Sequence, residues 1–135
     1  MAVILLPEQA GTVLGSSADA IMLFAPLLEN LTSEVLQIAH VDPAGALLGL
    51  SEAIIGDQDG VDLPIRGIVR DAVLLDASGV ILAHNHPSGD PTPSRADLGA
   101  TRRLGTALRA LDIRIVDHLV CGGGHWRSFR ALGLL

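Results

Sequence analysis

Two closely spaced histidines are the first candidates for chemistry. His84 and His86 end an almost wholly apolar run at residues 79–86, which is typical of a strand buried on both faces. Side chains two residues apart in a strand lie on the same face, so both imidazoles should point the same way and can converge on a metal ion. Taken alone, a His-x-His pair is more often structural or incidental than a metal site.

Ser94 and Asp97 open a predicted helix at residues 94–111, directly after a loop stiffened by three prolines. A serine followed three residues later by an acid is first of all a capping box. Asp97 also begins a stripe with helical spacing, which places its carboxylate on the face toward the core. The stripe continues through Thr101, Leu104, Leu108 and Leu111. A carboxylate on a buried face needs a compensating partner, and a divalent cation can be that partner.

The combined pattern is His84-x-His86, seven residues, then Ser94-x-x-Asp97. Two imidazole nitrogens and one carboxylate oxygen match catalytic zinc, which keeps three protein ligands and an open fourth position. An open position implies chemistry rather than a structural metal, because zinc lowers the pKa of water there. The sequence therefore predicts a hydrolytic site with one zinc ion per chain.

These residues also resemble the motif of a known family. The JAMM (MPN-plus) metalloproteases share a glutamate, then His-x-His, seven residues and Ser-x-x-Asp, and this sequence is similar to that motif without a gap. The longer string at residues 84–97, the pair Asp117-His118 and the ending at residues 128–135 look like the bacterial RadC branch in particular. The similarity extends from about Ser33 to the C-terminus, roughly three quarters of the chain.

The resemblance implies a JAB/MPN fold with cytidine-deaminase-like layering, and zinc held by His84, His86 and Asp97. The deaminase reaction itself is excluded, because it needs cysteine ligands and a Pro-Cys-x-x-Cys motif, and Cys121 is the only cysteine. Cys121 is expected to be a small apolar filler. The tripeptide His-Asn-His is no evidence for an HNH nuclease, whose name describes dispersed residues.

The family's general base, a glutamate at the start of an early strand, corresponds to Glu34. The position suits this role, because Glu34 lies on a largely apolar face of the predicted strand. An exposed strand-end acid is the alternative interpretation of Glu34, and Glu52 on the next strand is the rival base. Ser94 would donate its hydroxyl to the oxyanion of a tetrahedral intermediate.

Two further groups of residues are candidates for supporting roles. Asp117 and His118 could orient a zinc ligand, although a core histidine with satisfied hydrogen bonds is the simpler interpretation. Arg95, Arg102 and Arg109 recur every seven residues and form a stripe on the predicted helix, away from its apolar face. An acidic peptide or phosphates could bind this stripe, or it could be a solvated surface.

A helical lead-in at residues 1–32 and a metal-site core at residues 33–135 are expected within one domain. Ser16 or Ser17 would cap a first helix that Pro26 kinks or ends. A β-hairpin with strands at residues 34–41 and 46–54 follows. The lead-in is expected to be too short for the helical, DNA-associated segment that precedes this domain in longer RadC-like chains.

The second half alternates helices and strands. A helix should start after Asp62, with Pro64 in its first turn, and run to about Asp76. The strand at residues 79–86, the helix at 94–111 and strands at 113–120 and 126–129 follow. This order predicts an α/β fold of the α+β kind, a mixed sheet flanked by helices.

Composition limits the cellular compartment and the binding partners that are expected. A single cysteine favours a reducing compartment, and no apolar run approaches the length of a membrane span, so we expect a cytoplasmic protein. The net charge of −6 and an aromatic content of 2% give little support to nucleic-acid binding by charge or stacking. Only residues 91–135, with seven arginines against three aspartates, are locally basic.

Two functions from different classes fit the sequence. The first is a zinc-dependent metallohydrolase that cleaves peptide or isopeptide amide bonds in a peptide or protein substrate. The second is a DNA-repair or mobile-element accessory domain that binds DNA or a protein, with zinc structural or vestigial, since DNA repair is the historical label of the RadC branch. The presence of all five catalytic residue types favours the hydrolase. Substrate identity and oligomeric state lie beyond the sequence.

Overall fold

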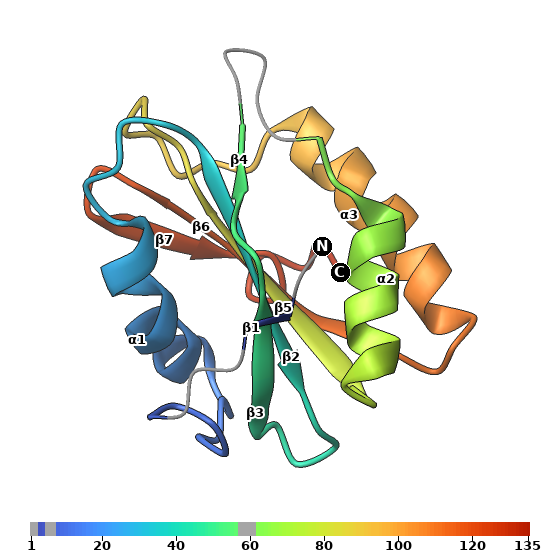
Figure 1. Cartoon of the computed structure of the whole chain (residues 1–135). Coiled ribbons are helices and arrows are strands. Elements are labelled where there is room, and N and C mark those ends of the chain that lie inside the picture. The colour runs from blue at the N-terminus through green and yellow to red at the C-terminus, as the bar shows by residue number, and fades with distance from the viewer. Residues whose placement is uncertain (1–2, 5–7, 57–61) are drawn as a thin grey trace.

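The computed structural model describes residues 3–4, 8–56 and 62–135, which form one sheet with helices on both faces (Figure 1). The helices are α1 (Ser17–Leu28), α2 (Ile65–Leu74) and α3 (Arg95–Arg109). The strands are β1 (Val3–Ile4), β2 (Val35–Val41), β3 (Leu47–Ser51), β4 (Ile54–Ile55), β5 (Gly79–Asn85), β6 (Arg114–Gly122) and β7 (His125–Ser128).

The sheet is mixed, which confirms the predicted fold class and is consistent with a JAB/MPN fold. Its strands run in the order β1-β3-β2-β5-β6-β7, and β4 pairs with the start of β2. β5 and β6 are parallel, with α3 as the crossover between them, and the other described pairs are antiparallel. Because His84 on β5 pairs with Leu36 on β2, residues just after β5 lie beside residues just before β2.

Two apolar cores lie on opposite faces of this sheet. α1 covers one face, while α2 and α3 cover the other (Figure 1). On β5, Ile81 and Ala83 pack toward α1, and Val80 and Leu82 pack toward α2 and α3. Every residue of β5 is buried, as expected of a strand covered on both faces.

The helices begin where their caps predict in two of three cases. Ser16 caps α1 by accepting a hydrogen bond from Asp19 N, and α1 ends two residues after Pro26, which lies in its last turn. α2 was predicted to start after Asp62, but Pro64 has a ψ of 79° and no side chain caps the first turn. Ile65 N donates instead to Leu63 O at 2.9 Å, so a tight turn precedes the helix.

Two predicted boundaries are wrong for local reasons. The strand predicted at residues 46–54 is interrupted after Ser51. Leu50 pairs with Ala39 and Ile54 pairs with Leu36, so four residues on this side of the ladder lie opposite three residues on β2. The extra residue breaks the ladder as a β-bulge does. Leu111 lies beyond the end of α3 and is 48% exposed, so it is not part of the buried stripe.

No helix among the described residues is long and apolar enough to cross a membrane. The cytoplasmic location stays a prediction.

Candidate metal site

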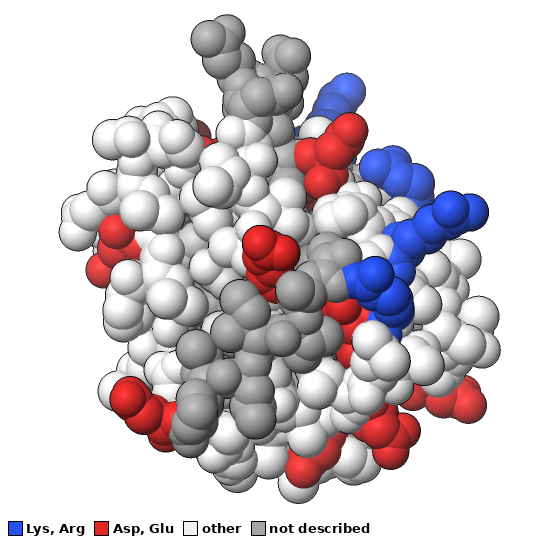
Figure 2. Space-filling view, in the orientation of Figure 1, with Lys and Arg blue, Asp and Glu red and all other residues white. Residues whose placement is uncertain are grey.

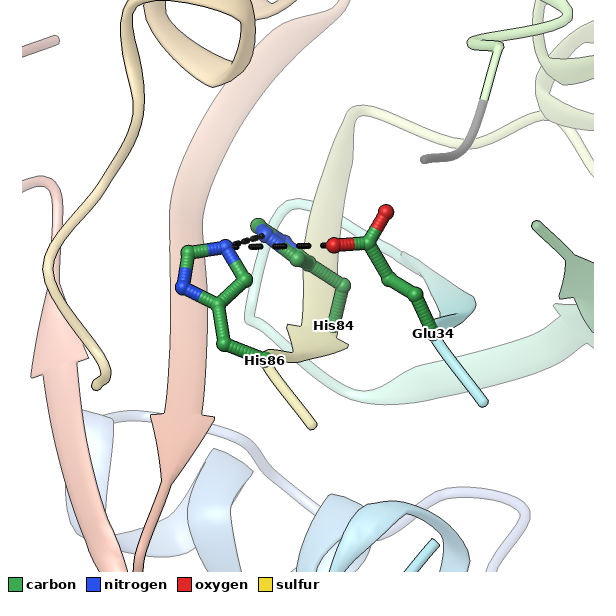
Figure 3. Close-up of side chains that lie close together, drawn as sticks. All are labelled: Glu34, His84 and His86. Carbon is green, nitrogen blue, oxygen red and sulfur yellow. Dashed lines mark hydrogen bonds and ion pairs between the residues drawn. The ribbon is translucent and has the colours of Figure 1, made fainter. Parts of the chain in front are cut away.

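The ends of three elements bring the predicted site residues together. His84 is on β5, His86 directly follows it, and Asp97 is in the first turn of α3. Glu34 immediately precedes β2, whose start lies beside the end of β5. The side chains of Glu34, His84 and His86 point toward one another (Figure 3), and one ligand atom from each lies within 4.8 Å of the others.

Three ligand atoms form a nearly equilateral triangle. His84 Nε2 lies 3.0 Å from His86 Nε2, and Asp97 Oδ2 lies 3.3 Å from the first nitrogen and 3.2 Å from the second. A tetrahedral zinc ion with ligands at 2.0–2.2 Å requires separations of about 3.3 Å between ligand atoms. The residues therefore fit a zinc ion, with His84, His86 and Asp97 on one triangular face of the tetrahedron.

A hydrogen-bond chain fixes the tautomer of His84. Thr101 Oγ1 donates its only proton to Asp97 O at 2.6 Å, so Thr101 Oγ1 must accept from His118 Nδ1, 2.8 Å away. Burial, and then the nearby His84, lowers the pKa of His118 well below its ordinary value. Neutral His118 thus offers the lone pair of Nε2 to His84 Nδ1–H at 2.8 Å. His84 is left with a lone pair on Nε2, as a metal ligand requires.

The loop that follows His86 fixes the same tautomer in its ring, with the proton on Nδ1. Its Nδ1 lies 2.8 Å from Asp90 O, and a carbonyl oxygen can only accept, so Nδ1 carries the proton. In the neutral ring Nε2 then bears a lone pair. With neither Nε2 protonated, the lone pairs of His84, His86 and Asp97 converge within 3.3 Å. Either a shared cation or a proton on one Nε2 compensates this convergence.

Without a metal ion, protons mediate the contacts between Asp97 and the two histidines. Burial opposes ionisation of Asp97, but hydrogen bonds with His84 and His86 outweigh burial and hold the pKa of this carboxyl well below its usual range. The hydrogen bond with Asp97 in turn raises the pKa of His86, against the effect of burial. Asp97 is thus an anion on the inner side of α3, where a cation would be stabilised.

Ser94 and Asp97 form the predicted capping box and also lie at the site. Ser94 Oγ accepts from Asp97 N at 3.0 Å, and Ser94 N donates to Asp97 Oδ2 at 2.8 Å. Asp97 Oδ2 is therefore both a helix cap and the oxygen that faces the histidines. Ser94 is exposed and keeps its hydroxyl proton for another acceptor.

Asn85 holds Glu34 in place, a role that sequence reasoning missed. Its Oδ1 accepts from Val35 N at 2.7 Å and its Nδ2 donates to Ser33 O at 2.9 Å. These two bonds clamp the backbone on both sides of Glu34, whose Oε1 lies 3.9 Å from His86 Nε2. A buried asparagine must satisfy both ends of its amide. An asparagine within the apolar run at residues 79–86 therefore indicates a hydrogen-bonding role, and this was the signal in the sequence.

Two glycines let the loop after His86 pack closely on the β6–β7 turn. A Cβ at Gly122 would lie 2.9 Å from the backbone carbon of Gly89, and a Cβ at Gly123 would lie 2.7 Å from the oxygen of Gly89. Gly123 also has a φ of +58°, which favours glycine. The close approach fixes the position of residues 86–90, which orient His86.

The site opens into a cavity of about 210 Å³. Its lining includes Glu34, His84, His86, Ser94 and Asp97. A second hollow of about 280 Å³ shares His86 and is lined by residues 28–31, by part of the loop at 85–89 and by 121–124. Space for a substrate therefore exists on two sides of His86.

The remaining candidates are distributed as follows. His118 contacts His84 and stacks on Phe129 at 4.4 Å, whereas the Asp117 carboxylate turns away and binds Ser128 Oγ at 2.6 Å. Glu52, the rival base, is exposed and does not line the cavity.

Cys121 lies in the core beneath α1, as expected of an apolar filler. Burial, and then Glu29, raises the pKa of its thiol to about 11. Arg95, Arg102 and Arg109 are exposed on α3, and none of them lines the metal-site cavity.

Comparison with known proteins agrees with this geometry. A family model described as a RadC-like JAB domain matches residues 14–134. Similar proteins include a UPF0758 protein of Xanthomonas axonopodis pv. citri, 40% identical over 112 residues, which cover 83% of this chain and 50% of the relative. A UPF0758 protein of Rhodobacter capsulatus is 45% identical over 103 residues, 76% of this chain and 48% of the relative. A third, of Chloroflexus aurantiacus, is 35% identical over 119 residues, 88% of this chain and 52% of the relative.

The chain thus spans about half the length of the curated relatives it matches. The family match covers nearly all of the described fold, including every residue of the candidate metal site. The chain belongs to the RadC-like JAB domain family.

Proposed function

We propose that this chain is a zinc-dependent hydrolase that cleaves peptide or isopeptide amide bonds. The observation that carries the proposal is the triangle of His84 Nε2, His86 Nε2 and Asp97 Oδ2, with separations of 3.0–3.3 Å. Three ligands on one side leave the opposite side to the cavity, as in catalytic rather than structural zinc sites. A bound zinc ion supplies Lewis-acid polarisation of a carbonyl and a water of lowered pKa.

Glu34 is the proposed general base. Its carboxylate lies beside the ligand triangle, at 3.9 Å from His86 Nε2, and the Asn85 clamp fixes the backbone that carries it. Glu34 Oε1 would take a proton from the attacking water and return it to the amine nitrogen as the C–N bond breaks. Its distance from the triangle suits a proton carrier better than a fourth metal ligand.

Ser94 is the proposed donor to the substrate oxygen. Its Oγ accepts from Asp97 N with one of its two lone pairs, so the hydroxyl proton is available to point into the cavity that Ser94 lines. A donor fixed in this way stabilises the negative charge that develops on the carbonyl oxygen during attack. The helix cap prevents Ser94 from rotating freely and so preorganises this contact.

The space around the site supports a peptide or protein substrate. The cavity and the hollow that shares His86 together offer room for chain on both sides of a scissile bond. Among the described residues, no Phe, Tyr or Trp lines either space, so neither offers a large aromatic ring for stacking of bases. An amide in an extended chain is the proposed substrate class.

A peptide-library assay tests the proposal. The purified protein is loaded with zinc, its zinc and iron contents are measured, and cleavage of the library is followed by mass spectrometry. We expect about one zinc per chain and cleavage that a chelator abolishes and added zinc restores. Iron in place of zinc, or a zinc-loaded folded protein that cleaves no amide in the library, would contradict the proposal.

A further inference from the structure

A third hollow lies along the second half of α3, and neither His84, His86 nor Asp97 lines it. Its volume is about 570 Å³, and it is bounded by the second half of α3, the start of β6 and residues 133–135. Its lining comprises Thr101, Arg102, Gly105, Thr106, Arg109, Arg114, Ile115 and residues 133–135. We call this hollow the arginine groove.

Three exposed arginines, Arg102, Arg109 and Arg114, face this groove. Within the described part of the chain, none of the three has a carboxylate within ion-pair distance, and no Asp or Glu side chain lines the groove. Arginines gather along the side of the molecule where α2 and α3 lie (Figure 2). In a chain of net charge −6, this cluster of three arginines marks a place for an anionic group.

The groove divides the arginine stripe that the sequence predicts. Arg102 and Arg109 line it, but Arg95, about two helical turns before Arg102, does not. Arg114 joins them from β6, because the chain reverses at Asp112, where φ is +57°. The binding surface is therefore built between two elements and is not a single face of the helix.

The remainder of the lining is small or aliphatic. Ile115 and Leu134 offer apolar surface, and Gly105 leaves room because it lacks a side chain. A Cβ at Gly105 would reach to 3.5 Å from Ile115. None of the described residues that line the groove has an aromatic ring, so these residues offer nucleobases no stacking platform.

We propose that the arginine groove binds an acidic segment of a protein partner. The guanidinium groups of Arg102, Arg109 and Arg114 bind its carboxylates, since arginine matches carboxylate geometry with two parallel hydrogen bonds. An aliphatic side chain of the same segment packs on Ile115 and Leu134. The groove offers no ring on which bases could stack among its described lining residues, which disfavours a single-stranded nucleic acid as the occupant. The proposal does not rest on the hydrolase activity.

Fluorescence anisotropy with a defined probe tests the proposal. The probe is a fluorescein-labelled peptide in which glutamate alternates with leucine and glycine, and a second peptide carries glutamine in place of glutamate. Arg102→Gln/Arg109→Gln/Arg114→Gln removes the groove charges. Arg66→Gln/Arg95→Gln/Arg103→Gln is the matched control, because it removes three exposed arginines that do not line the groove.

We expect saturable binding of the glutamate peptide and a loss of about tenfold or more in the groove variant, because each bond between charged groups contributes strongly to binding. The control variant should change affinity less than threefold, and the glutamine peptide should bind as weakly as the glutamate peptide binds the groove variant. Circular dichroism and urea unfolding confirm that all proteins are folded.

Three outcomes would overturn the proposal: no saturable binding by the folded parent, an equal loss in the control variant, or equal binding of the two peptides. A duplex DNA that displaces the peptide and binds more tightly would assign the groove to nucleic acid instead. Measurements on both zinc-loaded and chelator-treated protein separate this result from the hydrolase proposal, since the groove should bind in either state.

Discussion

Replacing Thr101 by valine removes one oxygen from the chain of hydrogen bonds that fixes the His84 tautomer. Valine keeps the shape of threonine, and position 101 is 4% exposed, so packing should change little. His118 Nδ1–H, which lies 2.8 Å from Thr101 Oγ1, loses its acceptor inside the protein. A buried donor left without a partner costs about 1–3 kcal/mol.

This energetic cost destabilises the arrangement of protons in which His84 Nε2 is free to bind metal. If the His118 proton moves to Nε2, it faces His84 Nδ1, and His84 must then carry its own proton on Nε2, the metal-binding atom. Either tautomer is thus less favourable for coordination. Groups that orient a metal-bound histidine typically contribute about 10–100-fold in affinity, so we expect Thr101→Val to weaken zinc binding by about that factor.

Competition for zinc against a chromophoric chelator measures the effect. Thr101→Ser should restore most of the affinity, because serine keeps the hydroxyl. Thr106→Val is the matched control, since Thr106 also donates to the backbone oxygen four residues earlier but is exposed. A Thr101→Val affinity within twofold of the parent, or an equal loss in Thr106→Val, would refute the proposed chain. Urea unfolding of the metal-free variants separates loss of affinity from loss of stability.

Three further predictions concern the acid stability of the fold, the Glu34 clamp and the metal ligands. Burial lowers the pKa of His40 to about 4, with Asp71 opposing, so the stability from neutral His40 is complete above pH 6.5 and is lost as the pH falls toward 4. The expected loss of stability is about 3 kcal/mol. Urea unfolding at pH 7 and pH 4 should show this loss in the parent and not in His40→Gln. An equal pH dependence of stability in both proteins would exclude His40 as the cause. Asn85→Ala leaves two part-buried backbone groups, Val35 N and Ser33 O, without their partner and should lower the free energy of unfolding by about 1–3 kcal/mol. Amide hydrolysis should fall more than zinc content, and unchanged hydrolysis per bound zinc would contradict the clamp. His84→Ala and Asp97→Asn should each reduce zinc well below one per chain by elemental analysis, and retention of the parent's zinc by both would remove these residues from the ligand set.

Local sequence spacing predicts much of the candidate site, because its main parts depend on short-range geometry. His84 and His86 are two positions apart at the end of β5, and one helical turn joins Ser94 to Asp97, so the spacing within each pair follows from its own element. The stiff loop between them is short, which limits where the second pair can lie relative to the first. The structure brings all four residues and Glu34 to one cavity, while their metal-binding and catalytic roles remain proposals.

The parts that the sequence did not predict depend on contacts between distant elements. Asn85 acts on Glu34 only because the end of β5 pairs with the start of β2. Thr101 meets His118 only because α3 crosses over β6. Arg114 joins the arginine groove for the same reason, since it begins the strand next to α3. Periodicity within one element contains no information about these pairings.

Replacing Glu34 by glutamine tests the central proposal most directly, because it separates proton transfer from metal binding. Glutamine has the shape of glutamate but cannot accept the proton, and Glu34 lies beside the ligand triangle rather than within it. The rate of amide hydrolysis is compared for zinc-loaded parent and Glu34→Gln, with the substrate that the peptide library identifies. We expect equal zinc content and a rate lower by about 10²–10⁴-fold, the usual contribution of a positioned general base. An unchanged rate at equal zinc content would contradict the mechanism.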